Sequence, residues 1–552
     1  MTNSAVDPLR VPRFRSLWLA SVLSNVGTFL QAVAASWLML ELTGSPLWVA
    51  AMAASTTLPL LFVALLAGAL ADIFDRRRIL LFSQTTMGLS ALAMALLWFF
   101  DALNAPALLA LGLALGTGLA FNLPAWQALV PDLVPRGMVA SAVALNSVAF
   151  NVARAVGPAL GGVIVAVYGP GLAFTLNAMS YLGVIAVIAS FGGAFRAADT
   201  TTVGGAVATG LRYARHTPVF RLLLAIAAGF ALTSAAVQAV LPNLTQEELG
   251  GSAVTYGALL GAMGVGALVG AFTRAGATKR LGRHTVAASI VGFGFAGVGL
   301  GVSSQVAPAA LAMATAGVFW VWTLSTLNAT VQLLSPGWVR GRAMSLYMLA
   351  FSGILPIGSL LAGAIASATT SATSITILAI AAVVFGLIVI GLRLPVPSLD
   401  DVARIEHDSD FVAPPHADHV EGSPVIILNT WTIAEEDLAP FLETMSELRT
   451  VRLRTGAVRW TLYRNVADAS RMTEQIVVAS WSEHLAQHRR IDAAAADLIR
   501  RARAFDRDGG PVTRHLAAID VSDPAMLPGW DDLHAVDVHA AAHASDGSIP
   551  LS

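Results

Sequence analysis

The chain has 552 residues, of which 56% are hydrophobic and only 12% are charged, and its mean hydropathy is +0.70. Soluble domains carry about 25% charged residues, so this composition excludes an ordinary soluble enzyme and a disordered protein. The absence of cysteine excludes disulfides, thiolate metal sites and cysteine nucleophiles. A bundle of membrane helices with an appended domain fits these numbers.

Twelve segments are long and apolar enough to cross a membrane, for which a helix needs about 20 residues. In chain order they are 16–38, 46–71, 78–100, 106–129, 139–168, 171–192, 219–242, 253–275, 284–304, 307–333, 343–367 and 373–393. The first is not a signal peptide, because no A-x-A-like cleavage site follows a short apolar core. The sequence therefore predicts an all-α polytopic membrane protein with 12 transmembrane helices.

Basic residues lie in alternate connections between these spans. The N-terminal arm and the even-numbered connections contain Arg10, Arg13, Arg15, Arg76, Arg77, Arg78, Arg136, Arg196, Arg212, Arg215, Lys279, Arg280, Arg283, Arg340 and Arg342. The odd-numbered connections contain no basic residue. Because cytoplasmic connections carry the excess of Lys and Arg, both termini are expected in the cytoplasm. The arginine and alanine bias is typical of a GC-rich bacterial genome, so the bacterial inner membrane is the expected location.

An internal repeat divides the spans into two groups of six. The matching pairs are Phe14 and Phe220, Arg15 and Arg221, Gln31 and Gln238, Glu41 and Glu248, and Ser45 and Ser252, at offsets of 206 or 207 residues. The shared offset predicts two six-helix halves, covering residues 1–200 and 201–397. Parallel halves of this kind are a transporter architecture, in which the substrate site lies between the halves near the membrane midplane.

The second connection contains Gly68, Asp72, Arg76 and Arg77. Gly68 permits a close approach of two helices, and Asp72 ends one helix where the arginines begin the next. Such a cluster can lock a cytoplasmic gate by charge-assisted hydrogen bonds and release it on rearrangement. The simpler alternative is a surface ion pair that accompanies positive-inside topology.

The fifth span contains a single cation, Arg154, followed by Gly157, Pro158, Gly161 and Gly162. Pro158 cannot donate to the helix ladder, and the small residues permit tight packing and a bend. Burying Arg154 costs about 2.5–3.5 kcal/mol, so a compensating role is expected. That role is attraction of an anionic substrate or stabilisation of a coupling carboxylate. The structural alternative is that Arg154 bonds helix carbonyls and nearby amides, namely Asn122, Asn146 and Asn151.

These motifs resemble those of the major facilitator superfamily. The run from Gly68 to Asp72 with the arginines after it is similar to the signature loop of the superfamily, although Asp75 stands where a second glycine is usual. The run from Gly157 to Gly162 resembles the element typical of export-direction antiporters. With residues 121–127 and 131–135, the resemblance over residues 10–395 is to the transmembrane secretion effector-like branch of enterobactin exporters and macrolide-type efflux proteins. It implies secondary transport by alternating access, driven by proton antiport.

Polar residues at bilayer depth are the candidates for lining a substrate cavity. They are Asn25, Gln31, Asn122, Gln127, Asn151, Gln238 and Asn328. No acidic residue falls in the core of a predicted span, so proton coupling is implied only by the resemblance, with Asp72 and Glu41 as candidates. The sequence has no P-loop pattern, which argues against ATP-driven transport.

The tail after residue 397 differs from the spans in composition and carries an excess of acidic residues. Residues 398–423 resemble a linker, and residues 424–521 show the order β-α-β-β-α-β, with the third strand predicted at 475–481 and the second helix at 483–505. This order suggests a cytoplasmic ferredoxin-like domain. This domain resembles the dimeric α+β barrel group, which suggests dimerisation through the tail. His484 and His488 have the i, i+4 spacing of a metal or base pair, but two exposed histidines are the commoner arrangement. Residues 522–552 are expected to be disordered.

The sequence favours a secondary active transporter that exports amphipathic small molecules, such as drugs, siderophores or secondary metabolites. It predicts no enzyme activity, catalytic residue, cofactor, metal or nucleic-acid partner; the partners are a small-molecule substrate and the lipid bilayer. One alternative is an importer or facilitator on the same fold. The other is a membrane-tethered sensor or enzyme that acts through its tail.

Overall fold

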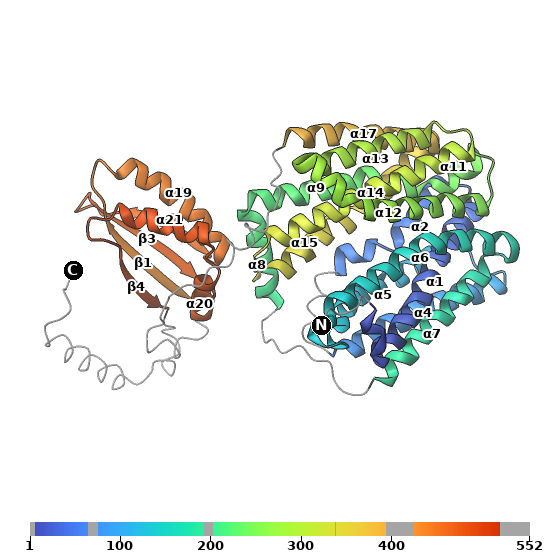
Figure 1. Cartoon of the computed structure of the whole chain (residues 1–552), viewed down its shortest axis with the longest axis horizontal. Helices are drawn as coiled ribbons and strands as arrows, with labels where there is room; N and C mark the ends of the chain where they lie inside the picture. Colours follow the sequence, from blue (N-terminus) through green and yellow to red (C-terminus); the bar gives the residue numbers. More distant parts are fainter. Residues whose placement is uncertain (1–5, 64–74, 192–202, 337, 393–423, 519–552) are drawn as a thin grey trace. The chain divides into compact units, whose positions relative to one another are not determined.

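The structure is a computed structural model that describes residues 6–63, 75–191, 203–336, 338–392 and 424–518 (Figure 1). The chain divides into two compact units. The first is helical and contains most of the chain before residue 397. The second combines the tail with residues 207–221 and 333–343.

Most helices that precede the tail overlap the predicted spans, but of the second predicted span, 46–71, residues 64–71 lie outside the described residues. In chain order the helices are α1 (Pro12–Thr43), α2 (Pro46–Ser55), α4 (Arg76–Phe99), α5 (Ala105–Asp132), α6 (Val139–Tyr168), α7 (Pro170–Ser190), α8 (Val203–His216), α9 (Pro218–Ser234), α10 (Ala236–Ala239), α11 (Leu241–Glu247), α12 (Ala253–Leu281), α13 (Thr285–Gly301), α14 (Val306–Leu334), α15 (Arg340–Ser352), α16 (Leu355–Ala368) and α17 (Ser371–Gly391). Short 3-10 helices lie at Asp7–Arg10, Arg136–Met138 and Gly282–His284.

Among the described residues, 10 helical stretches are long and apolar enough to cross a membrane. One of them, Ala253–Gly301, contains both α12 and α13, and α2 is a further, shorter apolar helix. Large apolar side chains such as Leu23, Phe272 and Phe295 are exposed on the helices, as expected for a surface that faces lipid. The helical, membrane-embedded class is therefore confirmed, while the count of twelve spans stays a prediction.

Proline, glycine and aspartate set several helix ends. Pro12 and Pro170 lie in the first turns of α1 and α7, where the missing amide costs no hydrogen bond. Gly44 follows α1 with a φ of 61°, a left-handed conformation that favours glycine. Asp75 caps α4 by accepting a hydrogen bond from the backbone amide of Arg77 at 3.0 Å.

Two predicted spans are interrupted. The seventh is divided into α9, α10 and α11, and the eleventh into α15 and α16. Pro242 and Pro356 lie in the first turns of α11 and α16. Each proline removes one backbone hydrogen bond, but the apolar sequence continues through it, so hydropathy alone predicts continuous spans.

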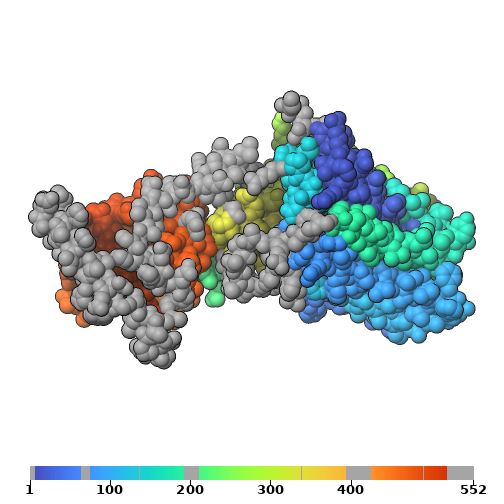
Figure 2. Space-filling view, turned by 90° about the horizontal axis from the view of Figure 1, so that it is seen from below, coloured from blue at the N-terminus to red at the C-terminus, as the bar shows by residue number. Residues whose placement is uncertain are grey.

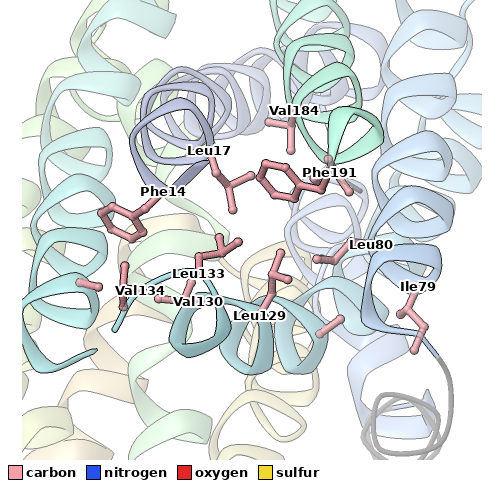
Figure 3. Close-up of a cluster of buried hydrophobic side chains, with 13 residues drawn as sticks. Phe14, Leu17, Ile79, Leu80, Leu129, Val130, Leu133, Val134, Val184 and Phe191 are labelled. Carbon is pink, nitrogen blue, oxygen red and sulfur yellow. The ribbon is translucent and has the colours of Figure 1, made fainter. Parts of the chain in front are cut away.

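The helices of the first half pack around an apolar cluster at one end of the unit (Figure 3). Phe14 and Leu17 of α1 meet Leu129 of α5 there, together with residues of α4 and α7. Figure 2 shows helices of this half, coloured dark blue to green, packed side by side. The cluster adjoins the start of α4 at residues 76–78, and we call this end the arginine-rich side. The end at which α1 finishes, at Thr43, is the arginine-poor side.

The two halves meet through small residues. Of the helices that face each other across the halves, α6 packs on α12 and α2 packs on α16. A Cβ atom added at Gly162 would lie 2.5 Å from the Ala253 carbonyl oxygen, and one added at Gly363 would lie 2.5 Å from the Ala50 side chain. Both of these close approaches lie toward the arginine-poor side, because Gly162 and Gly363 stand near the ends of α6 and α16 that are opposite the arginines. The halves are therefore in close contact on that side.

The tail forms a four-stranded antiparallel sheet with helices on one face (Figure 1). Its elements are β1 (Val425–Thr432), α19 (Leu438–Thr455), β2 (Arg459–Arg464), β3 (Arg471–Val478), α20 (Trp481–Arg489), α21 (Ala493–Ala504) and β4 (Val512–Ala517). The strand order is β2-β3-β1-β4, with Asn429 opposite Glu474 in the register. The helix-facing core consists of two apolar clusters, one containing Trp431 and Phe441 and the other Ile427 and Val478.

Besides the two interrupted spans, the structure differs from the prediction at α8, β3 and the pair α20 and α21. Residues 203–216, expected to be part of a connection, form the helix α8. The strand β3 begins at Arg471, before the predicted start at 475. The single helix predicted over 483–505 is two helices, because Asp492 starts α21 by accepting from the Ala495 amide at 2.7 Å. The predicted linker and the C-terminal segment after 521 lie outside the described residues, and the domain limits stay predictions.

Candidate functional site: a cavity shared by the two halves

The helical unit contains a cavity of 280 Å³ to which both halves contribute. Helices α1, α2, α4, α5, α6 and α7 of the first half and α10 and α12 of the second half line it. The volume lies near the lower end of the usual range for small-molecule sites. A cavity between the halves is the arrangement that the internal repeat predicts.

One part of the cavity wall is a hydrogen-bonded layer of α1 and α7. Asn177 Nδ2 donates to Gln31 Oε1 at 2.5 Å, and Ser180 Oγ donates to Asn177 Oδ1 at 3.0 Å. The hydroxyls of Thr28 and Tyr181 lie 3.1 Å apart. Asn177 and Gln31 are buried. Because these groups already bond each other, they hold α1 against α7 and present fixed dipoles to the cavity.

Another part of the wall is apolar and rich in methionine. Met52, Met94 and Met263 line it together with Leu115 and Leu260. An unbranched thioether side chain adapts its shape to what it contacts. The cavity is therefore amphipathic, with amides and hydroxyls in one part and adaptable apolar side chains in another.

Arg154 is the one charged side chain among the described residues that line the cavity. Its guanidinium carbon lies 5.5 Å from the ring centroid of Trp320, which belongs to α14 in the other half. This distance is within the range of a cation–π interaction. Trp320 is buried against Phe230, Phe293 and Phe351. The contact joins the two halves at the level of the cavity.

The glycines around Pro158 let α6 approach two neighbours. A Cβ at Gly157 would lie 2.7 Å from the Phe29 side chain of α1, whereas Gly162 faces α12. A Cβ at Gly161 would lie 3.1 Å from the backbone of α1. Pro158 itself lines the cavity, and its missing amide leaves the Arg154 carbonyl without a helical partner. The motif is a packing element between α1 and α12, and its role as a hinge stays a prediction.

Two glutamines that the repeat relates line the same cavity from different halves. Gln31 lies on α1, and Gln238 lies on α10, the short helix of the interrupted seventh span. Discontinuous helices are common at transporter substrate sites, because they free backbone groups to face the ligand.

Aromatic side chains lie between the halves beside the cavity, toward the arginine-poor side. Trp37 of α1 and Tyr256 of α12 stack with ring centroids 6.1 Å apart and planes 24° apart. Trp37 Nε1 donates to Glu41 Oε1 at 2.7 Å. Glu41, predicted for proton coupling, therefore contacts this aromatic pair at the exposed end of α1 and is not among the cavity-lining residues.

Five of the predicted cavity residues are not among those lining this cavity: Asn25, Asn122, Gln127, Asn151 and Asn328. Asn122 Oδ1 accepts from Gln84 Nε2 at 3.0 Å, and Asn151 Nδ2 donates to the Ser147 carbonyl at 2.8 Å. These two amides, offered above as structural partners for Arg154, are thus engaged elsewhere. Asn328 accepts from Gln332. A place for these residues on the substrate path stays a prediction.

The predicted gate motif is described in part. Gly68 and Asp72 lie outside the described residues, so their gating role stays a prediction. Arg76 Nη1 bonds the Asp132 carboxylate at 2.5 Å, which joins the start of α4 to the end of α5. Arg77 Nε donates to the Ile188 carbonyl at 3.1 Å, at the C-terminal end of α7, where a cation is favourable.

The histidines of the tail are not two exposed side chains, which corrects that expectation. His484 is 4% exposed, and its Nε2 lies 3.1 Å from Nε2 of His515 on β4. Burial, with the nearby charges of His488, His515 and Arg452, lowers the pKa of His484 to about 3. Burial likewise lowers the pKa of His488 to about 4. The part of the chain that the structure describes has no group of three His, Cys, Asp or Glu arranged to hold a metal ion.

Residues 3–522 match the family model described as transmembrane secretion effector. The chain belongs to this family. The match runs past the helices into the tail, so the sheet domain lies within the region that the family model covers. The transmembrane secretion effector match confirms the resemblance read from the motifs, and it makes the chain a transporter rather than an enzyme.

Relatives of this chain include proteins named as drug and siderophore transporters. The multidrug efflux pump Tap of Mycolicibacterium fortuitum is 27% identical over 388 residues, which are 67% of this chain and 91% of Tap. The staphyloferrin A transporter of Staphylococcus aureus is 24% identical and covers 62% of this chain and 86% of its own length. The enterobactin exporter EntS of Citrobacter koseri is 29% identical over 159 residues, 29% of this chain and 38% of EntS.

Solved transporters share the fold of the helical unit. A peptide transporter POT matches with a TM-score of 0.58 at 13% identity, covering 68% of this chain and 93% of its own. A D-xylose–proton symporter matches with a TM-score of 0.55 at 14% identity, covering 69% and 98%. At such identities the likeness concerns the fold alone.

Three residues of the site are not among the cavity candidates predicted from the sequence: Asn177, Tyr256 and Trp320. Asn177 and Trp320 are visible in the sequence as polar and aromatic residues at bilayer depth, but only their contacts with Gln31 and Arg154 distinguish them. Tyr256 stands near the start of a span, where aromatic residues commonly anchor a helix at the membrane surface, so no local signal points to the cavity.

Proposed function

We propose that the chain exports amphipathic small molecules across the bacterial inner membrane. The observation that carries this proposal is the cavity shared by both halves, with one cation, a hydrogen-bonded polar layer and methionine-rich apolar wall. Such a lining suits a ligand with an apolar body and a polar or anionic group. The named activities of the relatives, multidrug efflux, staphyloferrin transport and enterobactin export, support drugs, siderophores or secondary metabolites as substrates.

The proposed mechanism is alternating access between two six-helix halves, with twelve spans and both termini in the cytoplasm. The positive-inside rule assigns the arginine-rich side to the cytoplasm. Close packing at Gly162 and Gly363 on the other side supports a carrier that is closed to the outside in the present arrangement. Rocking of the halves would exchange this seam for closure at the cytoplasm, where Gly68, Asp72, Arg76 and Arg77 would stabilise the closed state.

Arg154 is the proposed attraction point for an anionic group of the substrate. Its charge lies in a cavity of low dielectric, where interactions between charges are stronger than in water. The face of the Trp320 ring stabilises the Arg154 guanidinium through a cation–π contact. The N–H groups at the edge of the guanidinium can then donate hydrogen bonds to a ligand.

Proton antiport is the proposed energy source, with Asp72 and Glu41 as candidate carboxylates. Glu41 accepts a hydrogen bond from Trp37, which stacks on Tyr256 across the halves. Protonation of Glu41 would weaken that bond and loosen the aromatic pair on the arginine-poor side.

The tail is proposed to be a cytoplasmic ferredoxin-like domain through which two chains pair. Its strand order, β2-β3-β1-β4, is consistent with that fold. On the face without helices, Ile426 lies opposite Val477 on one side and Leu516 on the other, which makes an apolar row. Leu516→Arg should turn a dimer of the full chain into a monomer in light scattering; a wild-type chain that is already monomeric would contradict the pairing.

Transport direction is tested in everted inner-membrane vesicles with fluorescent dyes and a catecholate siderophore. Export driven by protons predicts uptake that depends on an imposed pH gradient. Uptake that ignores the gradient would favour a facilitator, and uptake only in right-side-out vesicles would favour an importer. A membrane-tethered sensor or enzyme is the remaining alternative, and retained transport after removal of residues 398–552 would argue against it.

A further inference from the structure

The second compact unit brings the tail domain together with two segments from the helical part of the chain. One segment, residues 207–221, contains most of α8 and the first residues of α9. The other, residues 333–343, runs from the end of α14 to the start of α15. Both segments continue directly into proposed membrane spans, so a contact with them bears on the movement of those spans.

Arg212 of α8 contacts the tail at the end of α19. Its Nη1 donates to the Gly456 carbonyl at 2.6 Å and lies 3.8 Å from Glu483 Oε1. Gly456 has a φ of 151°, and a Cβ there would lie 2.9 Å from Glu483 Oε1 and 3.0 Å from Arg490 Nη1. Only glycine fits comfortably between these two charged groups while offering its carbonyl to Arg212.

Arg490 contacts the second segment. Its Nη1 and Nη2 bond the two oxygens of Glu483 at 2.6 and 3.1 Å, and its Cζ lies 4.8 Å from the ring centroid of Trp338. The Arg490 side chain is 10% exposed. The Arg490 guanidinium therefore binds through both its N–H edge, which is bidentate on the carboxylate, and its flat face, which stacks on the indole.

The two segments form one aromatic surface. Tyr213 of α8 packs edge-to-face on Trp338, with ring centroids 6.0 Å apart, and its other neighbour is Phe220 at 5.3 Å. Tyr213 is 3% exposed, and its hydroxyl donates to the Leu334 carbonyl at 3.4 Å. The surface on which Arg490 lies is therefore built from both segments at once.

We propose that Arg212, Tyr213 and Trp338 form a docking site for the tail of the same chain, and that docking favours the carrier state closed on the arginine-poor side. The occupant presents Gly456, Glu483 and Arg490. A contact made in one of two states stabilises that state by its own free energy. The second part of the proposal rests on the proposed function, because it requires two carrier states.

Docking is tested by hydrogen exchange of the full-length protein in lipid nanodiscs. Trp338→Ala should speed exchange at residues 452–457 at least threefold, and Arg490→Ala should do the same at residues 210–216. Trp338 lies outside the tail sheet, so its loss leaves the sheet folded. Trp338→Phe keeps an aromatic face and should have a smaller effect, and Arg500→Ala, which removes an exposed tail ion pair with Asp497, should have none. Unchanged exchange at residues 452–457 in Trp338→Ala and at residues 210–216 in Arg490→Ala would overturn the docking site.

The effect on the carrier state is tested with Ala53→Cys, a cavity position in a chain that has no other cysteine. Maleimide labelling from the arginine-rich side should slow at least twofold in the Trp338→Ala and Arg490→Ala backgrounds. Unchanged labelling in variants that have lost docking would overturn the proposal that docking favours the carrier state closed on the arginine-poor side. A wild-type protein without any transport would refute the proposed function, whereas the exchange experiment would still decide the docking site.

Discussion

Acidification should destabilise the tail domain through its buried histidines. The pKa of His484 is lowered from 6.5 to about 3 and that of His488 to about 4, mainly by burial. His484 Nε2 and His515 Nε2 lie 3.1 Å apart, a space that holds a single proton. The unfolded chain therefore binds more protons than the folded domain below pH 6.5. Stability that is present above pH 6.5 is lost as the pH falls from there toward the folded pKa values.

The size of this loss follows from the same values. At pH 5 the linkage relation gives about 2 kcal/mol for His484, and about 1 kcal/mol for His488 after allowance for its partial exposure. The sum of about 3 kcal/mol is a large fraction of the stability of a small domain. Arg452 is a fixed neighbouring charge that opposes protonation of both side chains.

The assay is hydrogen exchange of β1 and β3 amides in the full-length protein at pH 7.5 and pH 5, corrected for intrinsic exchange rates. The opening free energy should fall by about 3 kcal/mol between the two conditions. His484→Leu should remove more than half of this pH dependence, whereas His284→Leu, outside the tail, should leave it unchanged. Equal opening free energies at both pH values would show that the buried histidines do not make the stability of the tail depend on pH.

Two further predictions concern the helical unit. Gly162→Leu places a side chain where a Cβ already meets the Ala253 carbonyl at 2.5 Å, so the seam between α6 and α12 should open. A Ser36→Cys probe in the cavity should then react with maleimide at least threefold faster from the arginine-poor side, while Gly183→Leu, at a position with no neighbour within 4 Å, should have no effect. Asn177→Leu removes the donor to the buried Gln31 oxygen and should cost about 1–3 kcal/mol. The melting temperature in detergent should fall by several degrees; an unchanged value would show that the layer does not hold α1 against α7.

Most of the helical fold can be predicted from the sequence, because the length and hydropathy of a span are properties of its local sequence. Pro12 and Pro170 indicate helix starts, and the repeat relates Gln31 to Gln238, which meet in one cavity. The interruptions of the seventh and eleventh spans are hidden, because an apolar span tolerates proline when neighbouring helices satisfy the freed backbone groups.

The parts of the site that could not be predicted depend on contacts between distant segments. Arg154 stands out in the sequence as a cation in an apolar span, but its contact with Trp320 joins residues of different halves. His484 looks like a surface residue of a helix, and it becomes buried only because β4 brings His515 onto α20. The motif residues Gly68 and Asp72 lie outside the described residues, so their gating role stays a prediction.

We expect the cavity around Arg154 to be the transport site. The most direct test compares uptake of an anionic and a cationic dye of similar size by everted vesicles carrying the wild type, Arg154→Ala or Arg10→Ala, the last being a surface arginine. We expect at least a tenfold loss of anionic dye uptake in Arg154→Ala, less than a twofold loss for the cationic dye, and no change in Arg10→Ala. Equal uptake of the anionic dye by the wild type and Arg154→Ala would contradict this expectation.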